Sequence, residues 1–249
     1  MAEFFLRSLA DAIWVPGERQ ARFASKLHFK QSEILYGLYS CDYKAFSAVH
    51  ENRVRLQRPI EKAFVFVGRM VEEKGVRALA AAYKVYQSRT YDPWPLICYG
   101  RGPLAQMLAA EPGITVVDFV QPKDFPAKLA KAACLVLPSS FEPWAVVVHE
   151  AAAAGLLILA SEEVGAIPHL VQDSYNGFVF GVDDIDGLSQ LMRRVSLMGE
   201  VRLNAMAAAS SSLAKQFTPQ RWADTLLDYL EHAWHANEIP SVETMKSFH

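Results

Sequence analysis

Short apolar runs alternate with amphipathic stretches from Ala63 onward, and this alternation limits the fold more than any other feature of the sequence. The pattern is typical of a parallel sheet wrapped by helices, so it predicts an α/β fold with one doubly wound, Rossmann-like sheet. The expected strands are Ala63–Val67, Pro95–Tyr99, Ile114–Val120, Cys134–Leu137, Leu156–Ser161 and Gly177–Phe180. The expected helices lie near Gly75–Ser88, Pro103–Ala110, Pro122–Ala132, Ala145–Ala154, Gly165–Gln172 and Asp184–Met198.

The two ends of the chain differ from this central part, which we place at residues 60–216. Residues 41–59 are polar and lack clear periodicity, so we expect a connector there. Thr218 as N-cap and Pro219 at the first position predict a helix over 217–236, followed by a flexible tail at 237–249. Residues 1–40 look like the tail of another α/β domain, with a helix at Glu3–Ala10, a strand at Ala12–Val15, a helix at Glu18–Leu27 and a strand at Glu33–Tyr36.

Composition excludes several classes of protein. With 51% hydrophobic residues, 21% charged residues and a net charge of −2, the chain is expected to be globular and to bind no nucleic acid. Cys41, Cys98 and Cys134 are widely spaced, which favours buried reduced thiols and the cytoplasm. The sequence predicts neither a signal peptide nor a membrane span. Peripheral contact with the cytoplasmic face of a membrane stays open, because a few Lys, Arg and aromatic side chains on one helix would suffice.

Two carboxylates eight positions apart, Glu142 and Glu150, flank a predicted strand-to-helix junction. Carboxylates can accept hydrogen bonds from sugar hydroxyls. The backbone N–H groups of Trp144, Ala145 and Val146 fall at the start of the helix, where an anion such as phosphate is favoured. The alternative is that Glu150 is a paired acid in the core.

A second candidate segment, Gly68–Gly75, follows one predicted strand and precedes a helix. Arg69 can bind phosphate oxygens in a bidentate manner and Lys74 supplies a mobile point charge, so the segment is a candidate diphosphate clamp. It matches neither the Walker motif nor Gly-x-Gly-x-x-Gly. Solvated cations at a helix start are the alternative interpretation.

Other chemistries find little support. His149 and Glu150 begin a zincin-like pattern, but Ala153 stands where the second His belongs. His232 and His235 have no third ligand nearby in the sequence. Ser139 and Ser140 lack the Gly-x-Ser-x-Gly elbow of hydrolases, and we expect no metal and no cofactor.

Three motifs together resemble the C-terminal domain of retaining glycosyltransferases of family 4, which have the GT-B fold. They are Gly68-Arg69-x4-Lys74-Gly75, Pro138-x3-Glu142-Pro143-x6-Glu150-Ala151-x3-Gly155, and Val164-Gly165-x2-Pro168-x2-Val171-x5-Gly177. Their order and spacing match over about residues 60–235. Ala10–Pro16 also resembles the last strand of the family's N-terminal domain, and Phe217–Tyr229 resembles the final helix, which crosses back toward that domain. The resemblance therefore implies the C-terminal half of a GT-B fold with a remnant of the N-terminal domain.

The resemblance implies a nucleotide-diphosphate-sugar donor and a hexosyl transfer that retains anomeric configuration without a metal. Arg69, Lys74 and Glu142 would be the catalytic residues, with the two cations on the diphosphate and Glu142 near the sugar. Glu150 would hydrogen-bond the ribose, and backbone near Val120 would meet the base. The implied donor-binding residues are Gly68, Arg69, Lys74, Val120, Gln121, Glu142, Trp144, Ala145, Val146 and Glu150.

The chain departs from the family pattern in two ways. Ala145 and Ala166 stand where the family usually has glycine, and each adds a methyl group near the expected donor. The acceptor half of the fold, roughly another 100 to 200 residues, is mostly absent, so the partners expected are an unknown acceptor and a missing N-terminal domain or separate subunit. The implied role is synthesis of a polysaccharide, glycolipid or glycoconjugate. A non-catalytic nucleotide-sugar binding or partner module is the alternative, and a nucleotide-sugar epimerase is a third reading.

Overall fold

The computed structural model describes residues 9–236, with side chains as far as His232. Most of the helix expected at Glu3–Ala10 and all of the tail expected at 237–249 therefore lie outside the described residues. No helix in the described part is long and apolar enough to cross a membrane.

One sheet of six parallel strands organises the molecule, in the order β5-β4-β3-β6-β7-β8. The strands are β3 (Phe64–Val67), β4 (Leu96–Tyr99), β5 (Ile114–Val117), β6 (Cys134–Leu137), β7 (Leu157–Ser161) and β8 (Gly177–Phe180). All six were predicted, although β5 ends three residues earlier than expected. The order is that of a doubly wound sheet with β3 and β6 at its centre, so the predicted fold class is confirmed.

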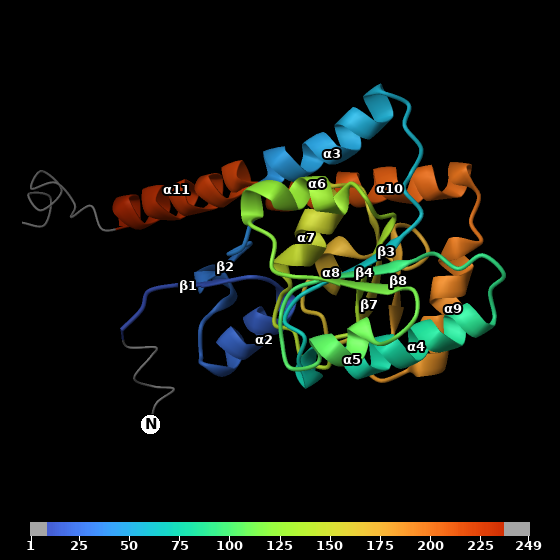
Figure 1. Cartoon of the computed structure of the whole chain (residues 1–249). Coiled ribbons are helices and arrows are strands. Elements are labelled where there is room, and N and C mark those ends of the chain that lie inside the picture. The colour runs from blue at the N-terminus through green and yellow to red at the C-terminus, as the bar shows by residue number, and fades with distance from the viewer. Residues whose placement is uncertain (1–8, 237–249) are drawn as a thin grey trace, which may run out of the picture.

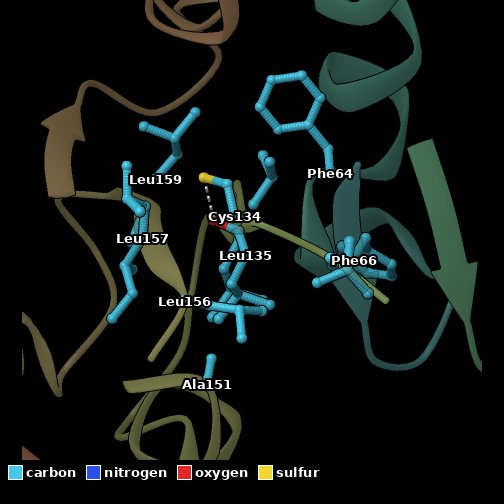
Figure 2. Close-up of a cluster of buried hydrophobic side chains, with 14 of the residues drawn as sticks. Phe64, Phe66, Cys134, Leu135, Ala151, Leu156, Leu157 and Leu159 are labelled. Carbon is cyan, nitrogen blue, oxygen red and sulfur yellow. Dashed lines mark hydrogen bonds between the residues drawn. The ribbon is translucent and has the colours of Figure 1, made fainter. Parts of the chain in front are cut away.

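The central strands are hydrophobic along their whole length because helices cover both faces of the sheet (Figure 1). Every residue of β6 and β7 is buried. Figure 2 shows the cluster around Cys134 and Leu135, with Phe64 and Phe66 of the neighbouring strand nearby. The three cysteines are free and buried, as expected, and burial raises the pKa of the Cys98 thiol to about 12.

Two layers of helices sandwich this sheet (Figure 1). One layer consists of α4 (Val76–Ser88), α5 (Ala105–Ala109) and α9 (Ile185–Ser196). The other consists of α3 (Tyr43–Arg55), α6 (Phe125–Leu129), α7 (Val146–Ala153) and α10 (Glu200–Ala214), with the short α8 (Ile167–Leu170) beside them. Single 3-10 turns occur at Gln31–Glu33, Glu72–Lys74, Pro122–Asp124 and Lys215–Phe217.

Two of these helices correct the sequence analysis. The stretch 41–59 contains α3, which begins where the Asp42 side chain accepts a hydrogen bond from the N–H of Ala45 at 3.2 Å. No helix was predicted between Met198 and Phe217, where α10 lies. Its small Ala and Ser residues form no apolar stripe, so periodicity could not reveal it.

The N-terminal part forms a small unit of its own. β1 (Ile13–Val15) and β2 (Ile34–Tyr36) pair in parallel, and α2 (Glu18–Lys26) connects them. Their buried side chains form a cluster separate from the main core: Val15, Ala21, Ala24, Leu27, Phe29 and Ile34.

Helix α11 (Pro219–Ala236) joins this unit to the rest of the chain. As predicted, Thr218 caps it, accepting a hydrogen bond from the N–H of Arg221 at 3.3 Å. The ring of Trp222 stacks on Trp14 with centroids 4.7 Å apart, and its Nε1–H donates to the Leu38 carbonyl at 3.0 Å. The last helix thus contacts the N-terminal strands.

Candidate functional site

The predicted site residues follow β3 and β6, the two strands at the centre of the sheet. In a doubly wound sheet the chain turns to opposite sides after these strands, which leaves a crevice at their carboxyl ends. Gly68–Gly75 follows β3 and Pro138–Ala145 follows β6. The topology therefore brings both candidate segments to one place.

These two loops are in direct contact. Gly75 has a left-handed conformation with φ +65°, and a Cβ there would lie 1.9 Å from the carbonyl oxygen of Pro138. The backbone N–H of Ser140 donates to the Glu73 carbonyl at 2.9 Å. Only glycine at position 75 allows the loops to approach this closely.

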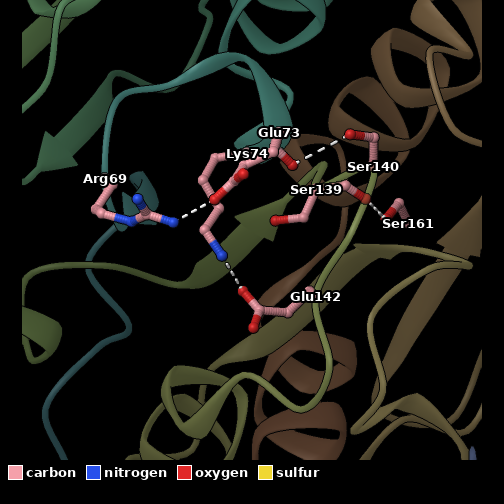
Figure 3. Close-up of polar contacts among 7 residues, drawn as sticks. All are labelled: Arg69, Glu73, Lys74, Ser139, Ser140, Glu142 and Ser161. Atoms are coloured by element: carbon pink, nitrogen blue, oxygen red, sulfur yellow. Dashed lines mark hydrogen bonds and ion pairs between the residues drawn. The ribbon is translucent and has the colours of Figure 1, made fainter.

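The charged side chains of the loops pair with one another, as Figure 3 shows. Lys74 forms an ion pair with Glu142, and both side chains are largely buried, with 14% and 16% of their surface exposed. Arg69 pairs with Glu73 on the surface, where 70% of the Arg69 side chain is exposed. Both cations predicted to bind phosphate thus have an acidic partner in this structure.

The loop after β7 holds the segment from Glu142 to Ala145 through backbone hydrogen bonds. The N–H of Gly165 donates to the Glu142 carbonyl at 2.8 Å, and the N–H of Ala166 donates to the Trp144 carbonyl at 2.9 Å. Ala145 has a φ of +75° and is the residue from which α7 begins. In the described part of the chain the backbone N–H groups of residues 144–147 have no hydrogen-bond partner, as is usual at a helix start, which favours an anion.

Two adjoining pockets open at this crevice and share Val67 and Gly68. The larger has a volume of about 580 Å³ and is mostly apolar; its lining is Val67, Gly68, Arg69, Tyr99, Gly100, Arg101, Phe119, Val120, Pro122, Phe125 and Glu150. The smaller has a volume of about 450 Å³; its lining is Tyr39, Val67, Gly68, Lys74, Glu142, Pro143, Trp144, Ala145, Val146 and Val147. Arg69 borders one pocket and Lys74 borders the other.

Glu150 is the acid of the larger pocket. Burial raises the pKa of its carboxyl to about 7. The Glu150 charge also acts on the thiol of Cys41: burial first, then this charge, raises the pKa of that thiol to about 12. No hydrogen-bond or ion-pair partner of the Glu150 carboxyl occurs within the described residues, so it is not the paired core acid of the alternative interpretation.

The structure brings together nine of the ten predicted donor-binding residues. The larger pocket takes Gly68, Arg69, Val120 and Glu150, and the smaller takes Gly68, Lys74, Glu142, Trp144, Ala145 and Val146. Gln121 is exposed and lines neither pocket. Ala166 is fully buried and lines neither, so of the two alanines that stand where the family usually has glycine only Ala145 borders a pocket.

Several lining residues were not predicted, most clearly Tyr39, Tyr99 and Phe119. Phe119 is 58% exposed beside Val120; it was missed because the expected strand Ile114–Val120 included it, whereas β5 ends at Val117. Tyr39 comes from a distant part of the chain and had no signal in the sequence.

His149 belongs to the core. It is 1% exposed and its Nε2 lies 3.0 Å from the Ala214 carbonyl. Burial lowers the pKa of His149 to about 4, so the ring is neutral near pH 7. The described residues contain no group of three His, Cys, Asp or Glu side chains placed to hold a metal ion; the side chain of His235 lies outside them.

Comparison with known proteins decides the family. Residues 61–197, more than half of the chain, match the family described as glycosyl transferases group 1. The chain belongs to this family. The matched segment contains both loops and all the predicted site residues.

Curated relatives are distant and longer. The chain is 25% identical over 181 residues to an uncharacterized glycosyltransferase, YqgM, of Bacillus subtilis, covering 70% of this chain and 48% of that protein. It is 28% identical over 162 residues to the O-antigen chain mannosyltransferase B of Escherichia coli, covering 62% and 42%. The chain therefore spans about half the length of the curated relatives it matches.

Solved structures of GT-B glycosyltransferases share the fold. Sucrose-phosphate synthase from Thermosynechococcus elongatus superposes with a TM-score of 0.74 at 20% identity, covering 92% of this chain and 59% of that one. The pneumococcal O-GlcNAc transferase GtfA, solved with UDP and GlcNAc, gives 0.73 at 17% identity, covering 94% and 47%. HepE from Anabaena, solved with UDP-glucose, gives 0.68 at 18% identity, covering 88% and 64%. The six-stranded α/β domain thus resembles GT-B glycosyltransferase domains.

Proposed function

We propose that this chain is the donor-binding part of a retaining glycosyltransferase of family 4 that transfers a hexosyl group from a nucleotide diphosphate sugar. The observation that carries the proposal is the pair of adjoining pockets at the centre of the sheet, with one candidate phosphate-binding cation in each. A nucleoside fits the larger pocket, and a glycosyl group fits the smaller one, where the Lys74–Glu142 pair offers polar contacts. The diphosphate would then lie near Gly68, which both pockets share.

Each charged residue has a role that follows from its position. Arg69 and Lys74 would bind the diphosphate and stabilise the negative charge that develops on it as the bond to the sugar breaks. The free N–H groups at the start of α7 would add donors to the same oxygens. Glu142, paired with Lys74, would accept hydrogen bonds from the sugar, and Glu150 would accept them from the ribose.

Because Lys74 and Arg69 already have acidic partners, donor binding would require an exchange of partners. The diphosphate would share Lys74 with Glu142, bringing the carboxylate and the sugar to the same cation. It would displace Glu73 from Arg69, which costs little, since exposed ion pairs contribute about 0–1 kcal/mol.

Relatives suggest the first donors to test. HepE and GtfA were solved with UDP-glucose and with UDP, which places uridine nucleotides first, and the mannosyltransferase relative makes guanosine diphosphate mannose the second choice. The acceptor would be bound by an N-terminal domain or by a separate subunit. We further propose that transfer needs no metal and takes place in the cytoplasm. The protein would associate there with the cytoplasmic face of a membrane.

A non-catalytic nucleotide-sugar binding module is the second candidate. The observation that favours it is Ala145, which borders the smaller pocket in a left-handed conformation that glycine adopts more readily. Release of the sugar from a bound donor, to water or to an acceptor, would exclude this candidate.

Calorimetry tests the proposal directly. We expect one of uridine, guanosine or adenosine diphosphate to bind the chain, and Lys74→Ala and Arg69→Ala to weaken that binding by about ten- to a hundredfold, the usual contribution of a hydrogen bond to a charged group. Lys84→Ala is the matched control, because Lys84 is exposed on α4 away from both pockets. Failure of all three diphosphates to bind would refute the proposal.

A further inference from the structure

The first turn of α2 touches the loop that forms the smaller pocket, although the two are more than 120 residues apart in the sequence. Gln20 donates a hydrogen bond from Nε2 to the carbonyl of Pro143 at 2.6 Å. Next to it, Arg19 pairs with Glu163 at 3.3 Å and also donates to the Glu162 carbonyl. These contacts tie the N-terminal unit to two loops of the sheet domain.

Close packing at Gly17 reinforces the contact. A Cβ at this position would lie 2.5 Å from Nε2 of His169 and 2.7 Å from the ring of Trp144. The φ of Gly17 is −172°, which any residue can adopt, so the constraint is lack of space and not backbone strain. The Trp144 ring, 2% exposed, also contacts His169 and Phe217, with centroids 5.5 and 5.4 Å away.

His169 presents the acceptor that this arrangement needs. The backbone N–H of Glu18 donates to its Nε2 at 3.2 Å. Burial lowers the pKa of His169, which favours the neutral ring whose Nε2 can accept.

Three consecutive carbonyl groups of the pocket loop are therefore held by hydrogen bonds. Those of Glu142 and Trp144 bind the N–H groups of Gly165 and Ala166, within the sheet domain. The middle one, of Pro143, binds Gln20 of the N-terminal unit. The shape of the loop that carries Glu142 into the smaller pocket thus depends in part on a residue outside the sheet domain.

We propose that the first turn of α2, Gly17 to Gln20, is a positioning element of the smaller pocket, and that Gln20 fixes the Glu142–Trp144 loop in the shape that binds the glycosyl group of the donor. This inference rests on the function proposed above. Gln20 acts through Pro143 and touches neither pocket. The larger pocket has no residue in this contact, so we expect binding of the nucleoside to depend on it less than binding of the glycosyl group does.

The experiment compares two affinities in the full chain: that of the nucleoside diphosphate that binds it, and that of the corresponding sugar nucleotide. The ratio of the two affinities measures the contribution of the glycosyl group to binding. Gln20→Met keeps the length of the side chain but removes the N–H donor, so we expect it to weaken sugar-nucleotide binding by about three- to tenfold, the range for one hydrogen bond, and to weaken diphosphate binding less. Gly17→Ala, which displaces Trp144, should change the ratio in the same direction.

Two controls separate positioning from general damage. Arg22→Met makes the same replacement at an exposed site on the same helix and should leave the ratio unchanged. Gln20→Lys restores an N–H donor and should recover part of the sugar-nucleotide affinity that Gln20→Met loses. If the wild type binds both ligands but Gln20→Met and Gly17→Ala change both affinities equally, or neither, the inference is wrong while the proposed function stands. Absence of diphosphate binding to the wild type would refute both.

Discussion

At the scale of single residues, the site combines charges that pair with one another and one acid, Glu150, that has no hydrogen-bond or ion-pair partner among the described residues. Lys74 and Glu142 neutralise each other in a largely buried pair. Glu150 shares the larger pocket with Arg69 and Arg101, but these cations pair with Glu73 and Asp118. A buried carboxylate without a partner lowers the stability of the folded state. In a site that binds a sugar, the hydroxyl groups of the ligand can donate the hydrogen bonds that this carboxylate lacks.

Glu150→Gln tests this effect through the pH dependence of stability. The pKa of Glu150 rises from an ordinary 4.5 to about 7 in the folded state because of burial. The folded state therefore binds this proton more tightly, and stability is lost as the pH rises from 4.5 to 7. We expect Glu150→Gln to be more stable than the wild type at pH 8, by up to about 3 kcal/mol, and to differ little at pH 5. Urea unfolding at both pH values measures the difference.

Exposed Glu231 on α11 provides the control: Glu231→Gln should show no such pH-dependent difference. If Glu150 also binds ribose, wild-type nucleotide affinity should increase with pH up to about 7, while Glu150→Gln should bind more weakly with little dependence on pH. A change in stability without any change in nucleotide affinity would make Glu150 a structural acid only.

At the scale of elements, hydrophobic periodicity predicted the strands and helices that have a clear apolar face or are apolar throughout. It missed two helices, α3 and α10, that have neither. All strands of the large sheet were found because their apolar runs are continuous, as in β6 and β7. α10 was missed because its buried residues include Ser210, which hydrogen-bonds Asn176, and alanines that resemble those on its exposed side. Helix α3 was missed for a similar reason: it is mostly polar, and only Phe46 and Ser47 are buried on it.

The site was predictable to a similar degree. Loops after parallel strands must meet at one edge, which is why Arg69, Lys74, Glu142 and Glu150 could be grouped from the sequence. Their pairing was not predictable, because Lys74 and Glu142 are 68 residues apart and many partners satisfy the same spacing. The contact of Gln20 with Pro143 depends on packing between two units and was equally invisible.

The start of α7 allows a test at this scale. Ala145 has a φ of +75°, a conformation that costs a residue with a Cβ about 1–2 kcal/mol. Ala145→Gly relieves this strain, which offsets the lost methyl contact and the greater freedom of the unfolded chain, about 1–2 kcal/mol together. We therefore expect chemical denaturation to show a stability within about 0.5 kcal/mol of the wild type.

Ala152 supplies the matched control, since it lies fully buried within the same helix in a right-handed conformation. Ala152→Gly should cost about 1–2 kcal/mol through lower helix propensity and a lost methyl contact. Equal costs at the two positions would show that the left-handed conformation of Ala145 stores no strain.

At the scale of the whole molecule, two hydrophobic cores of very different size are joined by a few contacts. The main core extends through both faces of the six-stranded sheet, whereas the N-terminal unit has a core of its own beneath two strands of three residues each. Small cores contribute little stability. The contacts of α2 with the pocket loop and of α11 with β1 and β2 therefore hold the smaller unit in place.

Hydrogen exchange measured by mass spectrometry should reveal this division. Regions with few buried apolar contacts open locally at lower free energy, so we expect amides of β1 and β2 to exchange much faster than those of β6. Trp222→Ala removes both the stacking on Trp14 and the hydrogen bond to Leu38, and should accelerate exchange in residues 13–36 by about tenfold or more while leaving β6 unchanged. Trp222→Phe, which keeps an aromatic ring, should have a smaller effect. Equal acceleration in β6 would show that the two cores unfold as one unit, and that the N-terminal unit cannot move relative to the pocket loop while the sheet stays folded.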